Sequence, residues 1–293
     1  MMYETREDIS LVIPAHNEER VVGRLLDALL VGGADGLDIV VVCNGCTDGT
    51  AQAARSRGPA VRVVELEQPS KHRALRVGDE HAKGFPRIYV DADVVLSGAD
   101  ARRVAAALDA PGVLASAPER ELPLDASDWR VRAFYRVWLR LPTVRQGLFG
   151  RGVVGVSEEG HARLVALPEL MADDLAFSLA FSPEERQVVA EARAVIQPPR
   201  NWPDLMRRRI RAMTSTVQLE HHQRTSGTPA HGDSAASART SLGDLRALVR
   251  AEPSLLPSVA VFAATAVLAR RAARRAIRAG DFATWLRDES SRS

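Results

Sequence analysis

The chain has 293 residues, which is long enough to bury a sizeable core in one large domain or two smaller ones. Its composition, 46% hydrophobic and 26% charged, is typical of a globular protein, and a formal charge of +2 is too small to favour a nucleic-acid partner. The first residues carry acidic side chains and no apolar run, which predicts no signal peptide and a cytoplasmic location. Two cysteines cannot build a disulfide framework.

Apolar runs alternate with amphipathic segments through the first hundred residues. Strands are predicted at 9–13, 39–42, 61–66 and 87–90, and helices at 19–30, after residue 49, and at 73–82. The strands lack polar alternation, so we expect them to be buried on both faces of a parallel sheet that helices cover. The sequence therefore predicts an α/β fold with a doubly wound, mostly parallel sheet, whose ligands bind at the carboxyl ends of the strands.

Polar side chains follow three of these strands where each strand ends. Asp91 and Asp93 follow the fourth strand, one residue apart. Their mutual repulsion is relieved if a divalent cation lies beside them, and hard oxygen ligands suit Mg²⁺ or Mn²⁺. A solvated surface turn is the alternative for this spacing. The first strand is followed by Pro14, Ala15, His16, Asn17 and Glu18, and the second by Cys43, Asn44, Gly45 and Cys46.

Four segments in a fixed order carry a resemblance to a known family: SLVIPAHNEERVVGRLLDAL, IVVVCNGCTDGTAQAA, SKHRAL and IYVDADVVL. Together they resemble the nucleotide-sugar-binding half of family 2 glycosyltransferases, which have the GT-A fold. The resemblance implies an inverting transferase of the hexosyltransferase type, which moves a sugar from a nucleoside-diphosphate sugar to a hydroxyl acceptor. That acceptor would be a glycan, a lipid-linked molecule or a small molecule.

The resemblance also assigns roles on the donor side. Asp91 would reach the ribose and the metal, Ala92 would line the same turn, and Asp93 would coordinate the metal through the diphosphate oxygens. Lys71 matches the family's lysine loop and would place its ammonium near the diphosphate; a solvated lysine is the alternative.

The nucleoside pocket is implied by two further motifs. Four residues match the loop that lines it: Pro14, Ala15, Asn17 and Glu18. An acidic residue at a helix N-terminus, which caps the helix and complements its dipole, is the alternative for Glu18. Cys43 and Asn44 stand where many relatives carry an Asp-Asp pair that reads the base. Because a carboxylate acceptor is lost there, a uridine nucleotide is less secure than for the usual pattern.

The acceptor side is implied by an acidic pair and a glycine-rich loop. Asp174 matches the general base of the family, and Asp173 would orient the site; helix capping explains the same pair. Gly150 and Gly152 belong to a loop where missing side chains would let a sugar approach the backbone. A flexible hairpin is the alternative for this loop.

An arginine-rich segment stands where the processive synthases of the family carry Gln-x-x-Arg-Trp. Arg208 and Arg211 match that position, but the Gln and the Trp are replaced, which argues against a polymerising enzyme. Arg208 or Arg211 would hold the diphosphate, or both would form a solvated helix face.

Composition changes beyond residue 220. We predict a nucleotide-sugar-binding half at 1–100, an acceptor-side half at 101–218, a flexible linker at 219–240 and a helical region at 241–293. Residues 255–269 carry no charge, but fifteen residues fall short of the ~20 needed to cross a bilayer. They would pack on the protein, or 255–278 would lie peripherally at the inner face of the membrane.

Two other functions compete with the transferase. One is a nucleotide-binding scaffold that keeps the fold without transfer activity, in line with the unusual Cys43-Asn44 pair. The other is a thioredoxin-like redox protein, in which a helix N-terminus lowers the pKa of a thiol in Cys43 or Cys46. The redox function leaves Asp91, Asp93 and Asp174 unexplained.

Overall fold

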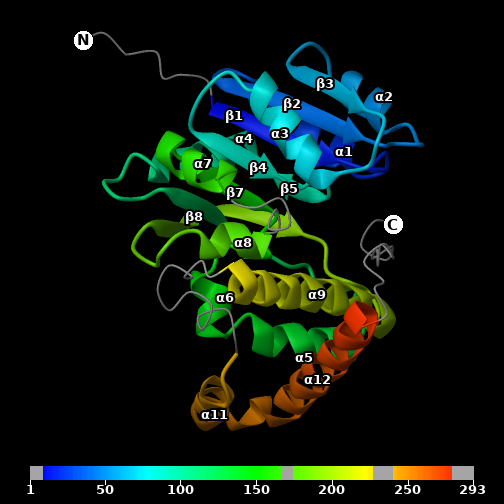
Figure 1. Ribbon diagram of the computed structural model, residues 1–293, viewed down its shortest axis with the longest axis vertical. Coiled ribbons are helices and arrows are strands. Elements are labelled where there is room, and N and C mark those ends of the chain that lie inside the picture. The colour runs from blue at the N-terminus through cyan, green and yellow to red at the C-terminus, as the bar shows by residue number, and fades with distance from the viewer. Residues whose placement is uncertain (1–8, 167–173, 227–239, 279–293) are drawn as a thin grey trace. The chain divides into compact units, whose positions relative to one another are not determined.

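The computed structural model describes residues 9–166, 174–226 and 240–278 (Figure 1). The chain divides into two compact units. The first consists of residues 1–121 and 148–196, and the second of residues 122–147 and 197–293. The described part of the first unit is α/β, and that of the second contains helices without a strand.

The first unit contains eight strands and six helices among the described residues. Its strands are β1 (Ile9–Ala15), β2 (Leu37–Asn44), β3 (Val61–Leu66), β4 (Arg87–Val90), β5 (Val94–Leu96), β6 (Ala115–Glu121), β7 (Val153–Val156) and β8 (Arg186–Ile196). Its helices are α1 (Val22–Leu30), α2 (Thr50–Arg55), α3 (Lys71–His81), α4 (Gly98–Ala107), α7 (Glu158–Val165) and α8 (Asp174–Leu179).

The strands form one sheet in the order β3-β2-β1-β4-β7-β6-β8-β5. The first four strands pair in parallel, so their carboxyl ends share one edge of the sheet. Beyond them the sheet is mixed, because β7 is antiparallel to β4 and to β6, whereas β6 and β8 are parallel. The predicted α/β sheet flanked by helices is confirmed. All strand pairs within the half that the four predicted strands build are parallel, whereas the other half has both parallel and antiparallel pairs.

Helices cover both faces of this sheet (Figure 1). Val12 of β1 and Val154 of β7 share an apolar cluster with Leu75 of α3. Gly155 points to the other face, where a Cβ would lie 2.9 Å from Val104 of α4. Because neighbouring residues of a strand alternate between faces, α3 and α4 cover opposite faces. A Cβ on Gly78 of α3 would overlap Val12, so this glycine lets α3 lie close to β1.

The second unit is a group of helices built around aromatic contacts. Its elements are α5 (Trp129–Trp138), α6 (Pro142–Gln146), α9 (Trp202–Ser226), α11 (Leu242–Ala251), the short 3₁₀ helix η2 (Pro253–Leu255) and α12 (Leu256–Arg278). Phe134 of α5 stacks on Phe262 of α12, with ring centroids 5.1 Å apart. The guanidinium of Arg209 lies 5.5 Å from the centre of the Phe134 ring. Asp128 joins α5 to α9, since its side chain caps α5 and also accepts from the Trp202 N–H at 2.8 Å.

Helix α9 corrects one predicted boundary. It continues to Ser226, eight residues into the segment 219–240 that the sequence predicts as a linker. The reason is that Gly227 and Pro229 are the first helix-breaking residues in that segment. Residues 227–239 lie outside the described part of the chain.

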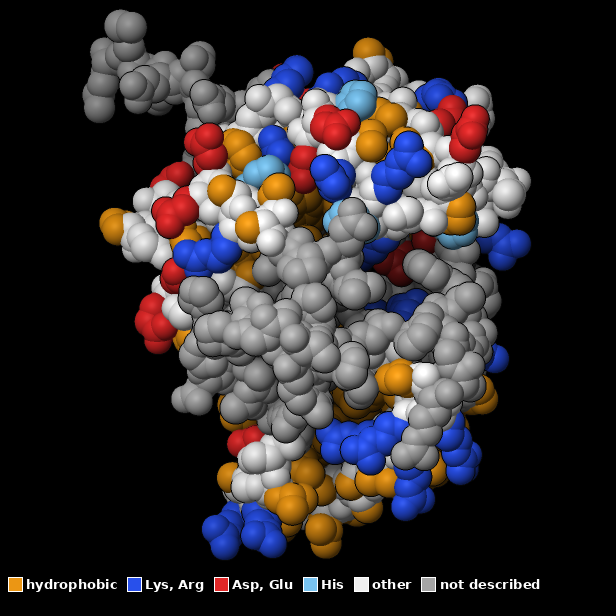
Figure 2. Space-filling model, in the orientation of Figure 1, with side chains coloured by type: hydrophobic (Ala, Val, Ile, Leu, Met, Phe, Trp, Pro, Cys, Tyr) orange, Lys and Arg blue, Asp and Glu red, His pale blue; other side chains and the backbone are white. Residues whose placement is uncertain are grey.

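Helix α12 is packed on one side only. Leu255 of η2 and five residues of α12 are buried at helical spacing. The five are Ser258, Phe262, Thr265, Ala269 and Ala273. On the other side Leu256 is 60% exposed and Val267 is 49% exposed. Blue basic and orange apolar side chains adjoin at the lower end of Figure 2, where Figure 1 labels α11 and α12. The helix therefore packs on the protein, but it is not an ordinary core helix.

Candidate functional site

The carboxyl ends of β1 and β2 are tied together by Asn44. Its side-chain amide donates to the Ala15 carbonyl at 2.8 Å and accepts from the Ser70 N–H at 3.0 Å. The carbonyl of Asn44 lies 2.6 Å from His16 Nδ1. Asn44 is 3% exposed, and its side-chain amide bonds to the backbone of two neighbouring segments, at Ala15 and at Ser70. The structure gives this residue a scaffolding position in the wall of the site.

The loops that follow β1 and β2 are also cross-linked to each other. The Asn17 side chain accepts from the Thr47 N–H at 2.8 Å, and Asn17 itself has a left-handed φ of 53°. The Glu18 N–H donates to Thr50 Oγ1 at 2.7 Å. Asn17 can adopt this conformation because Asn tolerates the left-handed region better than most residues. These contacts hold Pro14 to Glu18 as an ordered wall beside the end of β1.

Lys71, which the sequence predicts near a diphosphate, forms an ion pair in this structure with the carboxylate at the end of β4. Lys71 is the first residue of α3, which Ser70 caps through the Arg73 N–H. Its ammonium Nζ lies 2.8 Å from Asp91 Oδ1. The Asp91 N–H donates to the Gly152 carbonyl at 2.8 Å, which fixes the end of β4 against the residue before β7. Both charged side chains are about one third exposed and accessible to a ligand.

The Asp91-Ala92-Asp93 segment forms a tight turn between β4 and β5. The Val94 N–H donates to the Asp91 carbonyl at 3.2 Å, and Ala92 is buried. Among the described residues, no group of three or more His, Cys, Asp or Glu side chains is arranged as a metal site. Mg²⁺ is usually held by one or two carboxylates together with substrate phosphates, so the donor set of Asp91 and Asp93 fits such an ion.

A pocket opens beside the Lys71–Asp91 ion pair. The residues that line it are Pro14, Lys71, Leu75, Tyr89, Val90, Asp91, Gly152, Val153, Val154 and Phe177. The rings of Tyr89 and Phe177 meet edge to face with centroids 5.7 Å apart. The lining therefore combines the charged Lys71–Asp91 pair with the rings of Tyr89 and Phe177, which we call the aromatic floor of the pocket.

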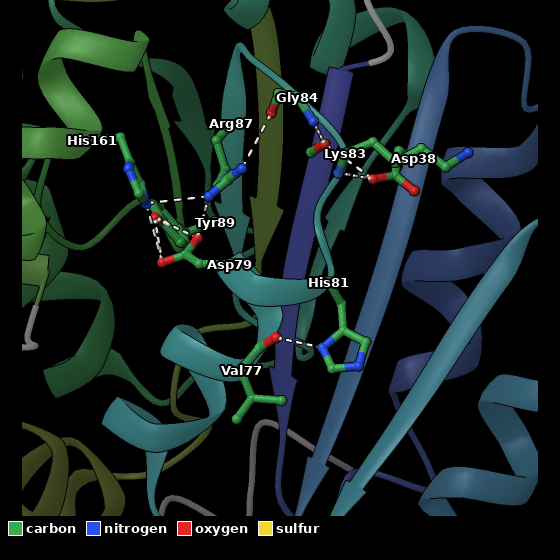
Figure 3. Close-up of polar contacts among 10 residues, drawn as sticks. Asp38, Val77, Asp79, His81, Lys83, Gly84, Arg87, Tyr89 and His161 are labelled. Atoms are coloured by element: carbon green, nitrogen blue, oxygen red, sulfur yellow. Dashed lines mark hydrogen bonds and ion pairs between the residues drawn. The ribbon is translucent and has the colours of Figure 1, made fainter.

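The floor is held in place by a buried polar cluster (Figure 3). The Tyr89 hydroxyl donates to Asp79 Oδ1 at 2.9 Å, and the Arg87 guanidinium pairs with the same carboxylate at 3.0 Å. His161 Nε2 lies 3.2 Å from Asp79 Oδ2. Burial and the neighbouring Asp79 raise the pKa of Tyr89, so its hydroxyl stays neutral and keeps its proton for this hydrogen bond. The cluster fixes the ring that faces the pocket.

The glycine-rich loop is anchored by a buried arginine. Arg151 is fully buried, and its Nη1 donates to the Pro118 carbonyl at 2.8 Å and pairs with Glu119 at 3.2 Å. Burial lowers the pKa of Arg151, and the pairing with Glu119 opposes that shift. Gly150 and Gly152 on either side have left-handed φ of 64° and 62°. Arg151 therefore anchors the loop to the end of β6, and Gly152 lines the pocket.

The predicted base lies at the start of α8. Asp174 is the first residue of this helix, and Asp173 lies outside the described residues. Phe177, one turn later in α8, lines the pocket. Ser178 fixes the helix, because its Oγ accepts from the Leu148 N–H at 3.0 Å. The backbone thus brings Asp174 within one helical turn of a residue that faces the pocket.

The two cysteines do not have the environment of a redox pair. Cys43 is 1% exposed, and burial raises the pKa of its thiol to about 12, with Cys46 raising it further. A reactive thiol needs a lowered pKa, because the thiolate is the nucleophile. The Cys46 thiol instead lies 3.5 Å from the Ala15 carbonyl, where it helps to close the loop. The structure therefore speaks against the thioredoxin-like alternative.

The two arginines predicted to hold the diphosphate belong to α9 of the second unit. Arg208 Nη1 donates to the Gln197 carbonyl at 3.2 Å, and Arg211 is exposed. Their role toward a ligand stays a prediction.

Several residues of the site were not predicted from the sequence. Tyr89 and Phe177 line the pocket, whereas Asp79 and His161 act behind it. One available signal was Arg87, a charged residue at the start of a short, otherwise apolar strand. Such a residue needs a buried partner, which here is Asp79.

Comparison with solved structures identifies the class of fold. A mannosyltransferase, PcManGT from Pyrobaculum calidifontis in complex with GDP-Man and Mn²⁺, superposes with a TM-score of 0.57. The alignment covers 96% of this chain and 88% of that chain, at 22% sequence identity. The shared fold is the GT-A fold of glycosyltransferases, as the sequence predicts.

Curated relatives match about a third of the chain. The 4,4'-diaponeurosporenoate glycosyltransferase of Staphylococcus aureus strain bovine RF122 / ET3-1 is 34% identical over 99 residues, which are 32% of this chain and 26% of that enzyme. The enzyme of the same name from strain USA300 is 35% identical over 97 residues, with the same coverage. The matched segment thus spans about a quarter of the length of these relatives.

Residues 10–157 match the family described as Glycosyl transferase family 2. These are 148 of the 293 residues, just over half of the chain. The chain belongs to glycosyl transferase family 2.

The close packing around Gly152 predicts that a larger residue at this position lowers the stability of the protein. A Cβ at this position would overlap Val94 and approach Asp91, in addition to the strain of a left-handed φ. Gly152→Ala should lower the free energy of unfolding by about 2–4 kcal/mol, measured by chemical denaturation. Gly112 is the matched control, because its φ is +82° and nothing lies within 4 Å of its Cβ position. Gly112→Ala should cost only about 1 kcal/mol. Equal losses in the two variants would contradict the close contact at Gly152.

Proposed function

We propose that this protein transfers a sugar from a nucleoside-diphosphate sugar to a hydroxyl acceptor, with inversion at the sugar carbon and with the help of a divalent metal. Family membership and the GT-A fold support glycosyl transfer. The observation that carries the proposal is the Lys71–Asp91 ion pair on the rim of the pocket, at the carboxyl end of β4. A cytoplasmic location would suit this reaction, because the donor is a soluble charged molecule.

The ion pair has a direct chemical meaning in the proposal. In this structure the Lys71 ammonium balances the charge of the Asp91 carboxylate at 2.8 Å. A bound diphosphate carries negative charge that attracts the same ammonium. Lys71 would then exchange one anionic partner for another, leaving Asp91 free to bind a cation. The ion pair thus prepares both groups without leaving either charge uncompensated.

Asp91 and Asp93 would hold Mg²⁺ or Mn²⁺ together with the diphosphate oxygens. A metal bound there supplies a Lewis acid that neutralises the charge on the leaving nucleoside diphosphate. Lys71 would add a second positive charge beside the same leaving group. Gly152 holds the Asp91 backbone, which keeps the carboxylate at the strand end when the ion pair opens.

The nucleoside would lie against the wall formed by Pro14, Ala15, Asn17 and Glu18. Cys43 and Asn44 would act indirectly in this pocket, because the Cys43 thiol is buried and the Asn44 amide is bonded to Ala15 and Ser70. The base would then be read by groups other than a carboxylate at these two positions. GDP- and dTDP-sugars are donors to be tested beside UDP-sugars.

Asp174 would remove the proton of the acceptor hydroxyl, with Asp173 orienting the site. The support for this role is the position of Asp174 at the start of α8, one turn from Phe177 of the pocket. A carboxylate at that place accepts the proton as the oxygen attacks the sugar carbon from the face opposite the leaving diphosphate. Gly150 and Gly152 would lie on the acceptor side, and the acceptor would be a glycan, a lipid-linked molecule or a small molecule. Arg208 or Arg211 would assist at the diphosphate.

Replacing Lys71 with methionine should move two affinities in opposite directions. Lys71→Met should weaken nucleoside-diphosphate binding in Mn²⁺ by about 10- to 100-fold, because a charged hydrogen bond is lost. It should strengthen binding of Mn²⁺ alone by a few-fold, about the effect of removing a competing exposed charge. Isothermal titration of the metal and then of the nucleotide measures both.

Lys83 supplies the control, because it is the only other lysine in the chain and lies beyond the far end of α3. Lys83→Met should change neither affinity. An unchanged nucleotide affinity in Lys71→Met would contradict the proposal that Lys71 exchanges Asp91 for the diphosphate.

Replacing Asp174 with asparagine should separate binding from turnover. Asp174→Asn should lower the transfer rate by about 10²–10⁴-fold, since the amide cannot accept the proton, while nucleotide affinity persists. The transfer rate is measured as the release of the nucleoside diphosphate, and the affinity for the donor is measured in parallel. Asp35→Asn, at an exposed site between α1 and β2, should leave both unchanged. Loss of nucleotide binding together with turnover would indicate a structural role for Asp174. Nucleotide binding by the wild type without any transfer would favour the scaffold alternative.

A further inference from the structure

Helix α12 of the second unit presents an exposed apolar stripe. Leu256 is 60% exposed, Val267 49% and Leu268 47%. These residues follow a helical spacing that places them on one side, opposite the buried Phe262 and Ala269. Exposed leucine and valine side chains are common singly, but a stripe along one helix marks an interaction surface.

The same side of the helix becomes strongly basic toward its C-terminal end. Arg270, Arg271, Arg274 and Arg275 are all exposed. We use the name α12 face for this surface, made of Leu256, Val267, Leu268 and the four arginines. Residues 253–278 contain no acidic residue. The α12 face thus combines apolar area with positive charge that no acid of its own helix neutralises.

The helix that leads into α12 has the same character. Helix α11 buries none of its residues, although it carries Leu242, Leu245 and Leu248, and Leu242 is 73% exposed. It adds Arg246 and Arg250 on its surface. Residues 241–278 carry seven arginines against two acidic residues, although the whole chain has a formal charge of only +2. Positive charge is therefore concentrated in this region.

The two acids in this region are already engaged. Asp244 forms a capping box with Ser241 at the start of α11. Glu252, at the turn before α12, lies 3.4 Å from Arg140 and 3.9 Å from Arg136 of α5. Neither carboxylate offsets the arginines of the α12 face.

We propose that the α12 face docks on the surface of an anionic lipid bilayer. The apolar residues would enter the boundary between headgroups and acyl chains, and the arginines would bind the anionic headgroups. This surface is separate from the pocket residues, so the proposal holds whether or not the glycosyl transfer proposed above is correct.

The structure favours an interfacial helix over a spanning one. The helix Pro253–Arg275 is long and apolar enough to cross a membrane by length and composition alone, which differs from the shortfall expected from the fifteen uncharged residues, and 28% of its most apolar window is buried. Its buried side packs on α5 and α9, which carry exposed arginines such as Arg136 and Arg207. Crossing the bilayer would carry those charges into the hydrocarbon, whereas lying in the interface leaves them in water.

The charge also favours lipid over a second copy of the chain. A two-fold dimer brings the same patch of both copies together, so arginines would face arginines. An anionic bilayer has the opposite charge. Leu256, Val267 and Leu268 add apolar area for which the phosphate backbone of a nucleic acid has no matching partner.

Vesicle flotation of the full chain tests the proposal. The protein should float with vesicles of phosphatidylcholine containing about 30% phosphatidylglycerol and stay behind with phosphatidylcholine alone, because the leaflet charge drives binding. Replacing the four arginines with glutamine should lower the partition coefficient by about 100- to 1,000-fold. Val267→Asn with Leu268→Asn should lower it by at least about tenfold.

A matched control uses exposed valines of the first unit. Val31 and Val165 are 75% and 63% exposed, so Val31→Asn with Val165→Asn should leave flotation unchanged. Circular dichroism confirms that each variant is folded. The proposal is overturned if the wild type does not float, if both vesicle types bind it equally, or if the asparagine pair at 267 and 268 binds like the wild type. Light scattering identifies the second copy as the occupant if the wild type is a dimer that this pair converts to a monomer without any vesicle binding.

Discussion

The candidate site depends on the parallel pairing of β1 with β2 on one side and with β4 on the other, because this pairing brings its residues together. Three strand ends that are far apart in the sequence come to one edge of the sheet, with residues Ala15, Asn44 and Asp91 at or next to those ends. Helix α3 returns to the same edge and begins with Lys71. An ammonium and a carboxylate therefore meet at 2.8 Å across twenty residues of sequence. Because the sheet fixes both backbones, the charges are positioned before any ligand arrives, which lowers the cost of binding an anionic donor.

The polar groups around this edge divide into those that hold the backbone and those that remain accessible. The side chains of Asn44, Asn17 and Thr50 form hydrogen bonds with neighbouring backbone segments. The Lys71–Asp91 ion pair, in contrast, is partly exposed and accessible to a ligand. Behind the pocket, the carboxylate of Asp79 contacts Tyr89, Arg87 and His161 in one largely buried cluster. A carboxylate shared by three partners resists movement, so the aromatic floor stays fixed.

Sequence reasoning reaches the fold and part of the site for identifiable reasons. Buried parallel strands have a continuous apolar pattern, so the first half of the sheet and the position of Asp91 at a strand end are predictable. The direction of the Asn44 side chain is not, because it depends on the register of β2 against β1 and on the approach of α3. The burial of Arg151 between two glycines is not predictable either, because it depends on contacts with Pro118 and Glu119, which are distant in the sequence. The polar composition beyond residue 218 predicts a linker, but α9 continues to Ser226 because no Gly or Pro stands between residue 219 and Gly227.

The proposed transfer requires that the strand-end carboxylates bind a metal together with a nucleotide. Thermal unfolding of the wild type and of Asp91→Asn with UDP-, GDP- and dTDP-sugars, with and without Mn²⁺, measures this most directly. One nucleotide should stabilise the wild type in Mn²⁺ by about 2.7 kcal/mol at a concentration a hundred times its Kd, and Asp91→Asn should lose that gain. Stabilisation of equal size without metal, or in Asp91→Asn, would contradict the claim, as would the lack of stabilisation by every nucleotide tested.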